Sequence, residues 1–187
     1  MNKSHDMCDS DEWRAVVRDS MLPWAIGEID LGDDVLEVGP GYGATTDVLG
    51  EMVSKLTAVE IDPVLVATLT ERFSGNSAVL IALGDATALD FPDGRFSGAV
   101  SFTMLHHVAT AELQDRMFAE VPRVLMPGAA FVAGDSLANP ELEALHLGDI
   151  YNPVSPDELH DRLAAAGFTG VEVKTNPFGW VALARKP

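Results

Sequence analysis

Short apolar segments alternate with segments of helical spacing along most of this chain, and this alternation limits the folds it can adopt. Strands are expected at residues 35–38, 56–60, 78–83, 96–102 and 129–135. Helices are expected at residues 12–29, 45–56, 63–73, 110–125 and 155–168. Apolar strands joined by helices form a parallel sheet that is covered on both faces, with right-handed crossovers.

The C-terminal segment predicts a different type of strand pairing. Residues 171–174 and 180–185 are strand-like, and the turn sequence Asn176-Pro177-Phe178-Gly179 separates them, which indicates an antiparallel hairpin. We therefore predict an α/β fold: a Rossmann-like, doubly wound, mostly parallel seven-stranded sheet with an antiparallel C-terminal hairpin strand.

Several residues mark where the expected helices begin, end or change direction. Asp62 is expected to cap the helix that begins at Pro63, and Ser155 the helix that begins one residue later. Pro23 predicts a break in the first helix, and Pro122 a kink or an early end. Residues 136–154 show no clear period.

The length and composition favour one domain. A chain of 187 residues that is 47% hydrophobic can bury one sizeable core. We expect a single domain over residues 1–187, with an N-terminal helical segment at 1–32 and a ligand-binding core at 33–135. Residues 136–187 would supply a variable loop, a helix and the hairpin.

Charge and cysteine content limit the partners. The formal net charge of -17 would repel a phosphate backbone, so a nucleic-acid partner is not expected. No apolar run has the length of a membrane span, and the acidic N-terminus is unlike a signal peptide. A single cysteine, Cys8, and the absence of zinc-type Cys/His spacing favour the reducing cytoplasm and predict no metal. In that compartment the glycosylation pattern Asn2-Lys3-Ser4 has no role.

The first strand leads into a glycine-rich turn, Glu37-Val38-Gly39-Pro40-Gly41-Tyr42-Gly43-Ala44. Glycines permit positive φ and let a ligand lie directly against the backbone. Gly39, Gly41 and Ala44 also satisfy the dinucleotide pattern G-x-G-x-x-G/A. The turn therefore predicts a ligand without selecting between cofactors.

Acidic residues end the next two strands. Glu60 follows Gly39 by 21 residues, where a carboxylate can accept hydrogen bonds from two ribose hydroxyls. Asp85, in Gly84-Asp85-Ala86, is suited to accept from an exocyclic amine, although aspartate is also a common turn residue. Together with Glu37, they place three acids beside one glycine loop.

This set of motifs resembles the class I S-adenosylmethionine-dependent methyltransferases. The resemblance rests on E-x-G-x-G-x-G, V-E-I-D, G-D-A and F-x-x-A-V-x-F-x-x-L-H-H-V, and it covers residues 33–135 closely. It implies S-adenosylmethionine as the cofactor and methyl transfer as the activity. It does not specify the methyl acceptor.

The resemblance also implies a role for each motif residue. Glu37 would face the methionine amino group, directly or through water, and Glu60 would hold the ribose hydroxyls. Asp85 would accept from the adenine N6 amine. The glycine loop would lie under the methionine and ribose (Gly39, Pro40, Gly41, Gly43). Ile61 and Ala86 would contact the adenine, and Thr103 would lie beside the methionine tail.

The charge of the cofactor separates this prediction from an NAD-linked oxidoreductase. A dinucleotide would place two phosphates near Glu37, which would repel them, whereas S-adenosylmethionine carries an ammonium and a sulfonium and no phosphate. An NAD-linked oxidoreductase and a non-catalytic nucleotide-binding module remain the alternatives.

Catalytic candidates follow the fourth strand. His106 and His107 are candidates for a general base, although packing or helix capping is a more common role for such histidines. Asp135 is a lesser candidate. His146 and Tyr151 lie in residues 136–154, which could cover the active site or form a surface loop. Tryptophans at positions 13 and 24 could form a lid over the cofactor, with packing on the sheet as the more common role.

The stretch VLEVGPGYGATTDVL…AVEIDP resembles ribosomal RNA adenine dimethyltransferases especially well. Those enzymes carry an Asn-Leu-Pro-Tyr type motif after the fourth strand, whereas this chain has Ser101-Phe102-Thr103-Met104. No basic C-terminal domain follows in this sequence. We therefore expect a small-molecule acceptor rather than an RNA amine, and favour oxygen as the methylated atom.

Overall fold

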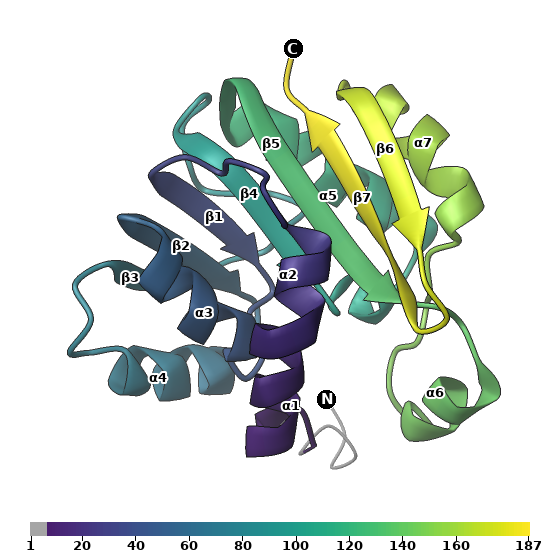
Figure 1. Cartoon of the computed structure of the whole chain (residues 1–187), viewed down its shortest axis with the longest axis horizontal. Helices are drawn as coiled ribbons and strands as arrows, with labels where there is room; N and C mark the ends of the chain where they lie inside the picture. Colours follow the sequence, from purple (N-terminus) through teal and green to yellow (C-terminus); the bar gives the residue numbers. More distant parts are fainter. Residues whose placement is uncertain (1–6) are drawn as a thin grey trace.

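The computed structural model describes residues 7–187, so the Asn2-Lys3-Ser4 pattern lies outside the described residues. Seven strands form one sheet in the order β3-β2-β1-β4-β5-β7-β6 (Figure 1). The strands are β1 (Asp34–Val38), β2 (Lys55–Glu60), β3 (Val79–Leu83), β4 (Phe96–Phe102), β5 (Leu125–Ser136), β6 (Thr169–Thr175) and β7 (Gly179–Arg185). Strands β1 to β5 pair in parallel, whereas β7 is antiparallel to both β5 and β6. The predicted fold class is confirmed.

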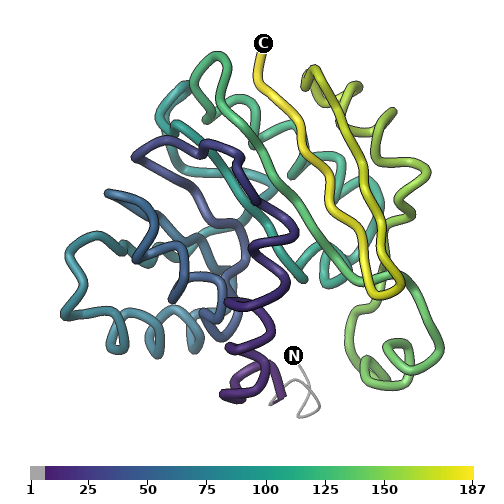
Figure 2. The backbone as a smooth tube through the Cα atoms, in the orientation of Figure 1, coloured from purple at the N-terminus to yellow at the C-terminus, as the bar shows by residue number. Residues whose placement is uncertain are grey.

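Helices cover both faces of this sheet (Figures 1 and 2). They are α1 (Asp11–Val16), η2 (Val17–Met21), α2 (Leu22–Ala25), α3 (Ala44–Met52), α4 (Pro63–Arg72), η3 (Leu105–His107), α5 (Ala111–Val124), α6 (Pro140–Leu145) and α7 (Pro156–Ala165). The strand order reverses between β1 and β4. Ligands of open α/β sheets bind at the carboxyl ends of the strands at such a switch point.

Alternation along the strands divides the core into two layers. Val35 packs with the N-terminal helices and α3, whereas its neighbour Leu36 packs with α5 and α7 on the opposite face. Both side chains are fully buried. Glu37 follows Val35 by two residues in β1, and side chains two residues apart in a strand point to the same face. The Glu37 side chain therefore lies on the face that α3 covers.

The N-terminal helices form one continuous rod in Figure 1. The expected break at Pro23 takes the form of a change in helix type: the π-helical turn η2 precedes α2, and Pro23 occupies the first turn of α2. In this continuous rod Pro23 has no amide hydrogen to donate to the preceding turn, and the π-helical turn η2 lies directly before α2. Trp24 packs in the core layer of this rod, and Lys174 of β6 donates to its carbonyl at 2.6 Å.

Four local predictions need correction. The helix expected over 45–56 ends at Met52, because Lys55 already pairs with Asp34 as the first residue of β2. An early end of the helix at Pro122 is also wrong, since Pro122 lies inside α5, which continues to Val124.

The remaining two corrections concern helix starts in the C-terminal part. Residues 136–154 contain the helix α6, which Asn139 caps by accepting from the Leu142 amide at 2.9 Å. Ser155 precedes α7 but makes no capping bond with its side chain. Its carbonyl instead accepts from the Glu158 amide at 3.2 Å, which closes the first turn.

Candidate functional site

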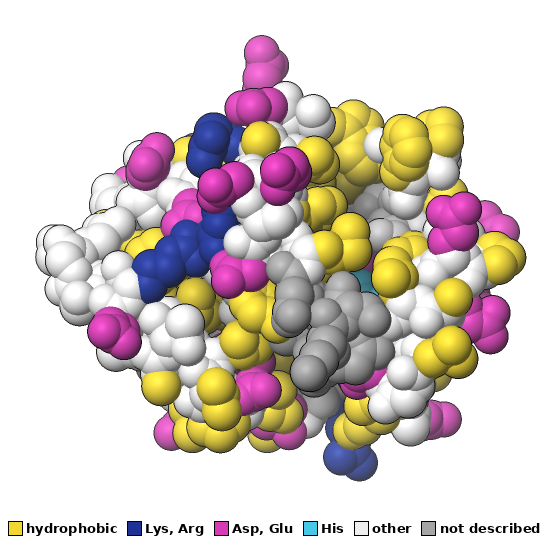
Figure 3. All heavy atoms as spheres, turned by 90° about the horizontal axis from the view of Figure 1, so that it is seen from below, with side chains coloured by type: hydrophobic (Ala, Val, Ile, Leu, Met, Phe, Trp, Pro, Cys, Tyr) yellow, Lys and Arg dark blue, Asp and Glu magenta, His cyan; other side chains and the backbone are white. Residues whose placement is uncertain are grey.

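A cavity of about 570 Å³ lies at the carboxyl ends of the parallel strands. The glycine loop, the ends of β2, β3 and β4, and the segment around α6 all contribute to its lining. Figure 3 views this face of the molecule and shows hydrophobic side chains over much of it, with a small patch of His near the centre. Acidic side chains surround the face, and Lys and Arg gather in only a few places on it. The cavity thus has the position and the size of a site for a small organic ligand.

The glycines of the loop have three different surroundings. Gly39 has φ 72°, and a Cβ there would lie 2.1 Å from Met104 Cγ, so no larger residue fits. Pro40 and Gly41 line the cavity directly, and Gly41 has φ 55° with open space beside it. Gly43, at φ 78°, is the N-cap of α3, and its Cβ would meet Leu69 at 2.7 Å, away from the cavity lining. Gly43 therefore shapes the loop through packing.

Glu60 joins the end of β2 to the glycine loop. Its Oε1 accepts hydrogen bonds from the amides of Ile61 at 2.8 Å and Asp62 at 2.9 Å, and its Oε2 accepts from the Gly41 amide at 3.1 Å. The residue is 7% exposed and lines the cavity. A carboxylate offers about four acceptor positions, so one remains for a ligand hydroxyl.

Glu37 lies behind the loop rather than in the cavity lining. It is 2% exposed, and Thr46 Oγ1 of α3 donates to its Oε2 at 2.7 Å. Burial raises the pKa of the Glu37 carboxyl from an ordinary 4.5 to about 8; the Thr46 hydrogen bond lowers it and the negative charges of Asp47 and Glu60 raise it further. In the ligand-free protein this carboxyl is thus largely protonated at neutral pH.

The adenine-side residues predicted from the sequence meet at one wall of the cavity. Ile61, Asp85 and Ala86 all line it. Ile61 is 66% exposed, which suits an apolar surface that a flat ring would cover. The amide and the hydroxyl of Thr87 both donate to Asp85 Oδ1 at 2.8 Å, which holds this carboxylate on its turn.

Thr103 lies directly after β4 and lines the cavity. It has φ 52° and is the one non-glycine residue with positive φ in the part of the chain that the structure describes. Its amide donates to the Gly134 carbonyl of β5 at 2.9 Å. A β-branched residue in this conformation is strained, and such strain clusters at functional sites.

His106 is held by Asp135 from the end of β5. Asp135 Oδ1 lies 2.7 Å from His106 Nδ1, and Oδ2 accepts from the His106 amide at 3.0 Å. Asp135 Oδ1 also accepts from the Ser136 amide at 2.8 Å. Because a carboxylate only accepts, Nδ1 of His106 carries the hydrogen and Nε2 carries the lone pair of the neutral ring.

Two further histidines surround His106 at the cavity. The ring centroids of His106 and His107 lie 4.2 Å apart, and those of His106 and His146 lie 5.0 Å apart. All three histidines line the cavity, and Tyr151 stacks on His146 at 4.6 Å. The sequence marked these residues individually, but their meeting depends on how the chain after α6 folds back over the site, which periodicity did not reveal.

The N-terminal segment also reaches the site. Cys8 and Trp13 line the cavity, whereas Trp24 does not. Burial raises the pKa of the Cys8 thiol above its ordinary value, so the thiol form predominates. Arg14 of α1 holds this segment to α3, because its Nη1 lies 2.7 Å from Asp47 Oδ2.

Fold and cavity together define a Rossmann-like α/β protein with a ligand site at the carboxyl edge of its sheet. A family model described as a methyltransferase domain matches residues 36–133, slightly more than half of the chain. The chain belongs to this methyltransferase domain family. The match supports S-adenosylmethionine as the cofactor, as the sequence motifs predicted.

Several curated relatives of this chain are named as ribosomal RNA methyltransferases. The probable ribosomal RNA small subunit methyltransferase A of Methanosarcina mazei is 36% identical over 92 residues, which cover 44% of this chain and 34% of that protein. The chain thus spans about a third of the length of the curated relatives it matches. The predicted resemblance to this group is thus confirmed over less than half of this chain.

Solved structures match the whole chain in fold. The PH0226 protein of Pyrococcus horikoshii superposes with a TM-score of 0.83 at 17% identity, covering 100% of both chains. Phosphoethanolamine N-methyltransferase 2 of Haemonchus contortus, solved in complex with S-adenosyl-L-methionine, has a TM-score of 0.77 at 15% identity and covers 100% of this chain and 60% of its own. At these identities the likeness shows the shared fold. Among the helices of residues 7–187, none is long and apolar enough to cross a membrane.

Proposed function

We propose that this protein transfers the methyl group of S-adenosylmethionine to a small-molecule acceptor bound in the same cavity. One observation carries the proposal: Glu60, Asp85 and the glycine loop, which come from three different strand ends, border one cavity. One ribose hydroxyl at Glu60 and an adenine amine at Asp85 would use the acceptor positions that remain on these two carboxylates. The sulfonium methyl would then lie toward Thr103 and the histidines.

Glu37 would complete the cofactor site from behind the loop. A buried carboxyl with a raised pKa ionises when a cation binds beside it, since the opposite charge offsets the cost of burial. The ammonium of the methionine group is such a cation, whereas the phosphates of a dinucleotide would disfavour ionisation. This difference favours S-adenosylmethionine over NAD.

Two features of the chain favour a small acceptor over RNA. The net charge is -17, and the residues at the end of β4 are Ser101-Phe102-Thr103-Met104 in place of an Asn-Leu-Pro-Tyr type motif. The names of the curated relatives favour RNA, but they rest on less than half of this chain. A direct comparison is methyl incorporation from labelled cofactor into ribosomal RNA and into a panel of small hydroxyl compounds and amines. Methylation of the RNA alone would contradict this part of the proposal.

His106 is the residue best placed to act as a base. Asp135 fixes its tautomer, so that Nε2 can take a proton from an acceptor hydroxyl. Methyl transfer from a sulfonium otherwise needs mainly alignment of the two reactants. His107 lines the same wall and is the second candidate.

Calorimetric titration tests the cofactor proposal. We expect S-adenosylmethionine and S-adenosylhomocysteine to bind at one site per chain and NAD not to bind. Asp85→Ala should weaken S-adenosylhomocysteine binding about tenfold or more through loss of a hydrogen bond to a charged acceptor. Asp90→Ala, which removes an exposed acid from the same connection outside the cavity lining, is the matched control and should bind normally. NAD binding without response to the other two ligands would refute the proposal.

A further inference from the structure

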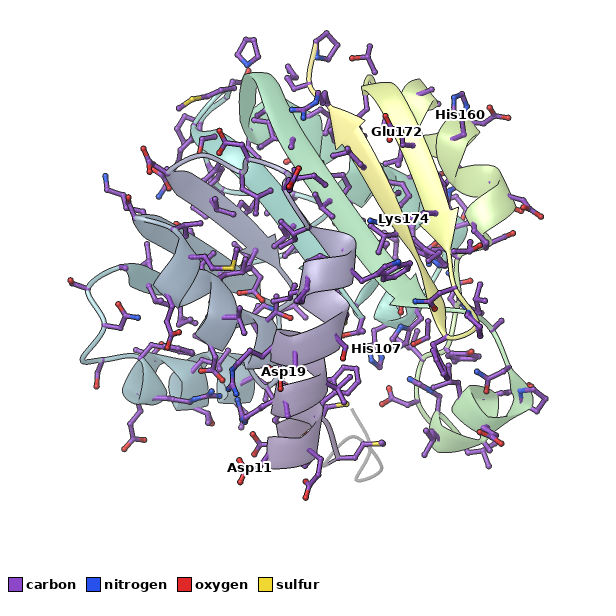
Figure 4. The ribbon with its side chains drawn as sticks, in the orientation of Figure 1. Asp11, Asp19, His107, His160, Glu172 and Lys174 are labelled. Carbon is purple, nitrogen blue, oxygen red and sulfur yellow. The ribbon has the colours of Figure 1, made fainter. Side chains whose placement is uncertain are left out.

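We propose that His106, His107 and His146 form a binding site for one divalent metal ion of the zinc type. Their ligand nitrogens all lie within 4.8 Å of one another. Two of them belong to η3, and the third follows α6, so the site joins segments that are far apart in the sequence. In Figure 4, His107 lies below the strand ends, between α1 and the α6 segment.

The hydrogen bonds behind two of the histidines match those of metal ligands. Nδ1 of His106 lies 2.7 Å from Asp135 Oδ1, and Nδ1 of His146 lies 2.6 Å from the Leu142 carbonyl oxygen. Both oxygens only accept, so each Nδ1 carries a hydrogen and each Nε2 carries the lone pair that a metal requires. Histidine ligands typically donate their other N–H to a carboxylate or a backbone carbonyl in this way, which fixes the ring and its tautomer.

The separations are close to those of a bound site. Three nitrogens at about 2.0–2.1 Å from one tetrahedral ion lie roughly 3.3 Å apart. Nitrogens that start within 4.8 Å of one another reach this spacing by movements of about 1.5 Å or less. His106 and His146 are already confined, with an 11% exposed side chain and 5% exposure of the residue respectively.

Three imidazoles select the metal and leave a position for the acceptor. Imidazole suits zinc, copper, nickel and iron, whereas magnesium and calcium prefer oxygen ligands. Sites with three protein ligands keep a fourth position for water or substrate. All three histidines line the cavity, so an acceptor hydroxyl could occupy that position, where the metal would lower its pKa in place of the His106 base. That last role rests on the proposed function, whereas metal binding does not.

Titration of the metal-free, tag-free protein with Zn²⁺ at pH 7.5 tests the site without cofactor or acceptor. We expect one ion to bind per chain, and Co²⁺ at the same site to give the intense visible absorption of a tetrahedral complex. His146→Gln and His107→Gln should each weaken zinc binding at least tenfold. His160→Gln is the matched control, because His160 lies exposed on α7, away from the cluster (Figure 4).

The titration has outcomes that support the metal site and outcomes that overturn it. No stoichiometric zinc binding by the wild-type protein, or full affinity retained in both variants, would overturn the site. If one variant unfolds, the other variant and the Co²⁺ spectrum of the wild-type protein decide whether the three histidines bind the metal. Because S-adenosylmethionine is absent, failure of this titration leaves the cofactor proposal unaffected, and failure of cofactor binding leaves the metal site unaffected.

Discussion

Replacing Glu37 by Gln should remove a large part of the pH dependence of stability. The folded carboxyl has a pKa of about 8 because it is buried, whereas in the unfolded chain it returns to an ordinary 4.5. Between these values the folded state holds a proton that the unfolded state has lost, so stability is full below pH 4.5 and decreases as the pH rises through 8. A difference of one bound proton corresponds to about 1.4 kcal/mol per pH unit, or about 4 kcal/mol between pH 5 and pH 8.

Urea unfolding at pH 5, 6, 7 and 8 measures this effect. We expect the wild-type protein to lose up to about 4 kcal/mol relative to Glu37→Gln over this range. The glutamine can still accept from Thr46 Oγ1, so the local hydrogen bond is kept. Glu51→Gln, an exposed acid at the end of α3, is the control and should follow the wild-type curve. Parallel pH curves for the wild-type protein and Glu37→Gln would refute the burial argument.

Two further substitutions test packing and positioning at the site. Gly39→Ala should cost at least about 2 kcal/mol of unfolding free energy in urea, because its Cβ would lie 2.1 Å from Met104 Cγ at a positive φ. Gly128→Ala is the control, because Gly128 also has positive φ but no atom lies within 4 Å of the new Cβ, and it should cost about 1–2 kcal/mol of unfolding free energy. Equal losses of unfolding free energy for Gly39→Ala and Gly128→Ala would contradict the packing argument. Asp135→Asn should weaken Zn²⁺ binding by about tenfold to a hundredfold in the same titration, because the amide can no longer fix the Nδ1–H tautomer of His106; unchanged affinity would contradict that role.

Local signals in the sequence were enough to predict the sheet and its glycine loop. The apolar runs predicted the five parallel strands, because such strands differ clearly in composition from the helices between them, and the turn sequence predicted the hairpin of β6 and β7. Asp62 caps α4 as expected, accepting from the Val64 amide at 2.8 Å. The motif residues Glu60 and Asp85 lie at one cavity because parallel strands carry their carboxyl ends to the same edge.

The sequence did not reveal features that depend on tertiary contacts. The helix at 45–56 was predicted too long because the pairing of Lys55 with Asp34 overrides helical propensity there. The meeting of His146 with His106 depends on α6, a helix of six residues that is too short to show a period. Similarly, Glu37 was expected at the ligand, and its position behind the loop under Thr46 follows only from how α3 packs on the sheet.

A crystal structure with S-adenosylhomocysteine tests the central claim most directly. We predict a ribose hydroxyl within hydrogen-bond distance of Glu60, the adenine amine within hydrogen-bond distance of Asp85, and the sulfur directed toward Thr103 and the three histidines. Adenosine bound elsewhere on the chain, or in this cavity with the sulfur directed away from the histidines, would contradict the account.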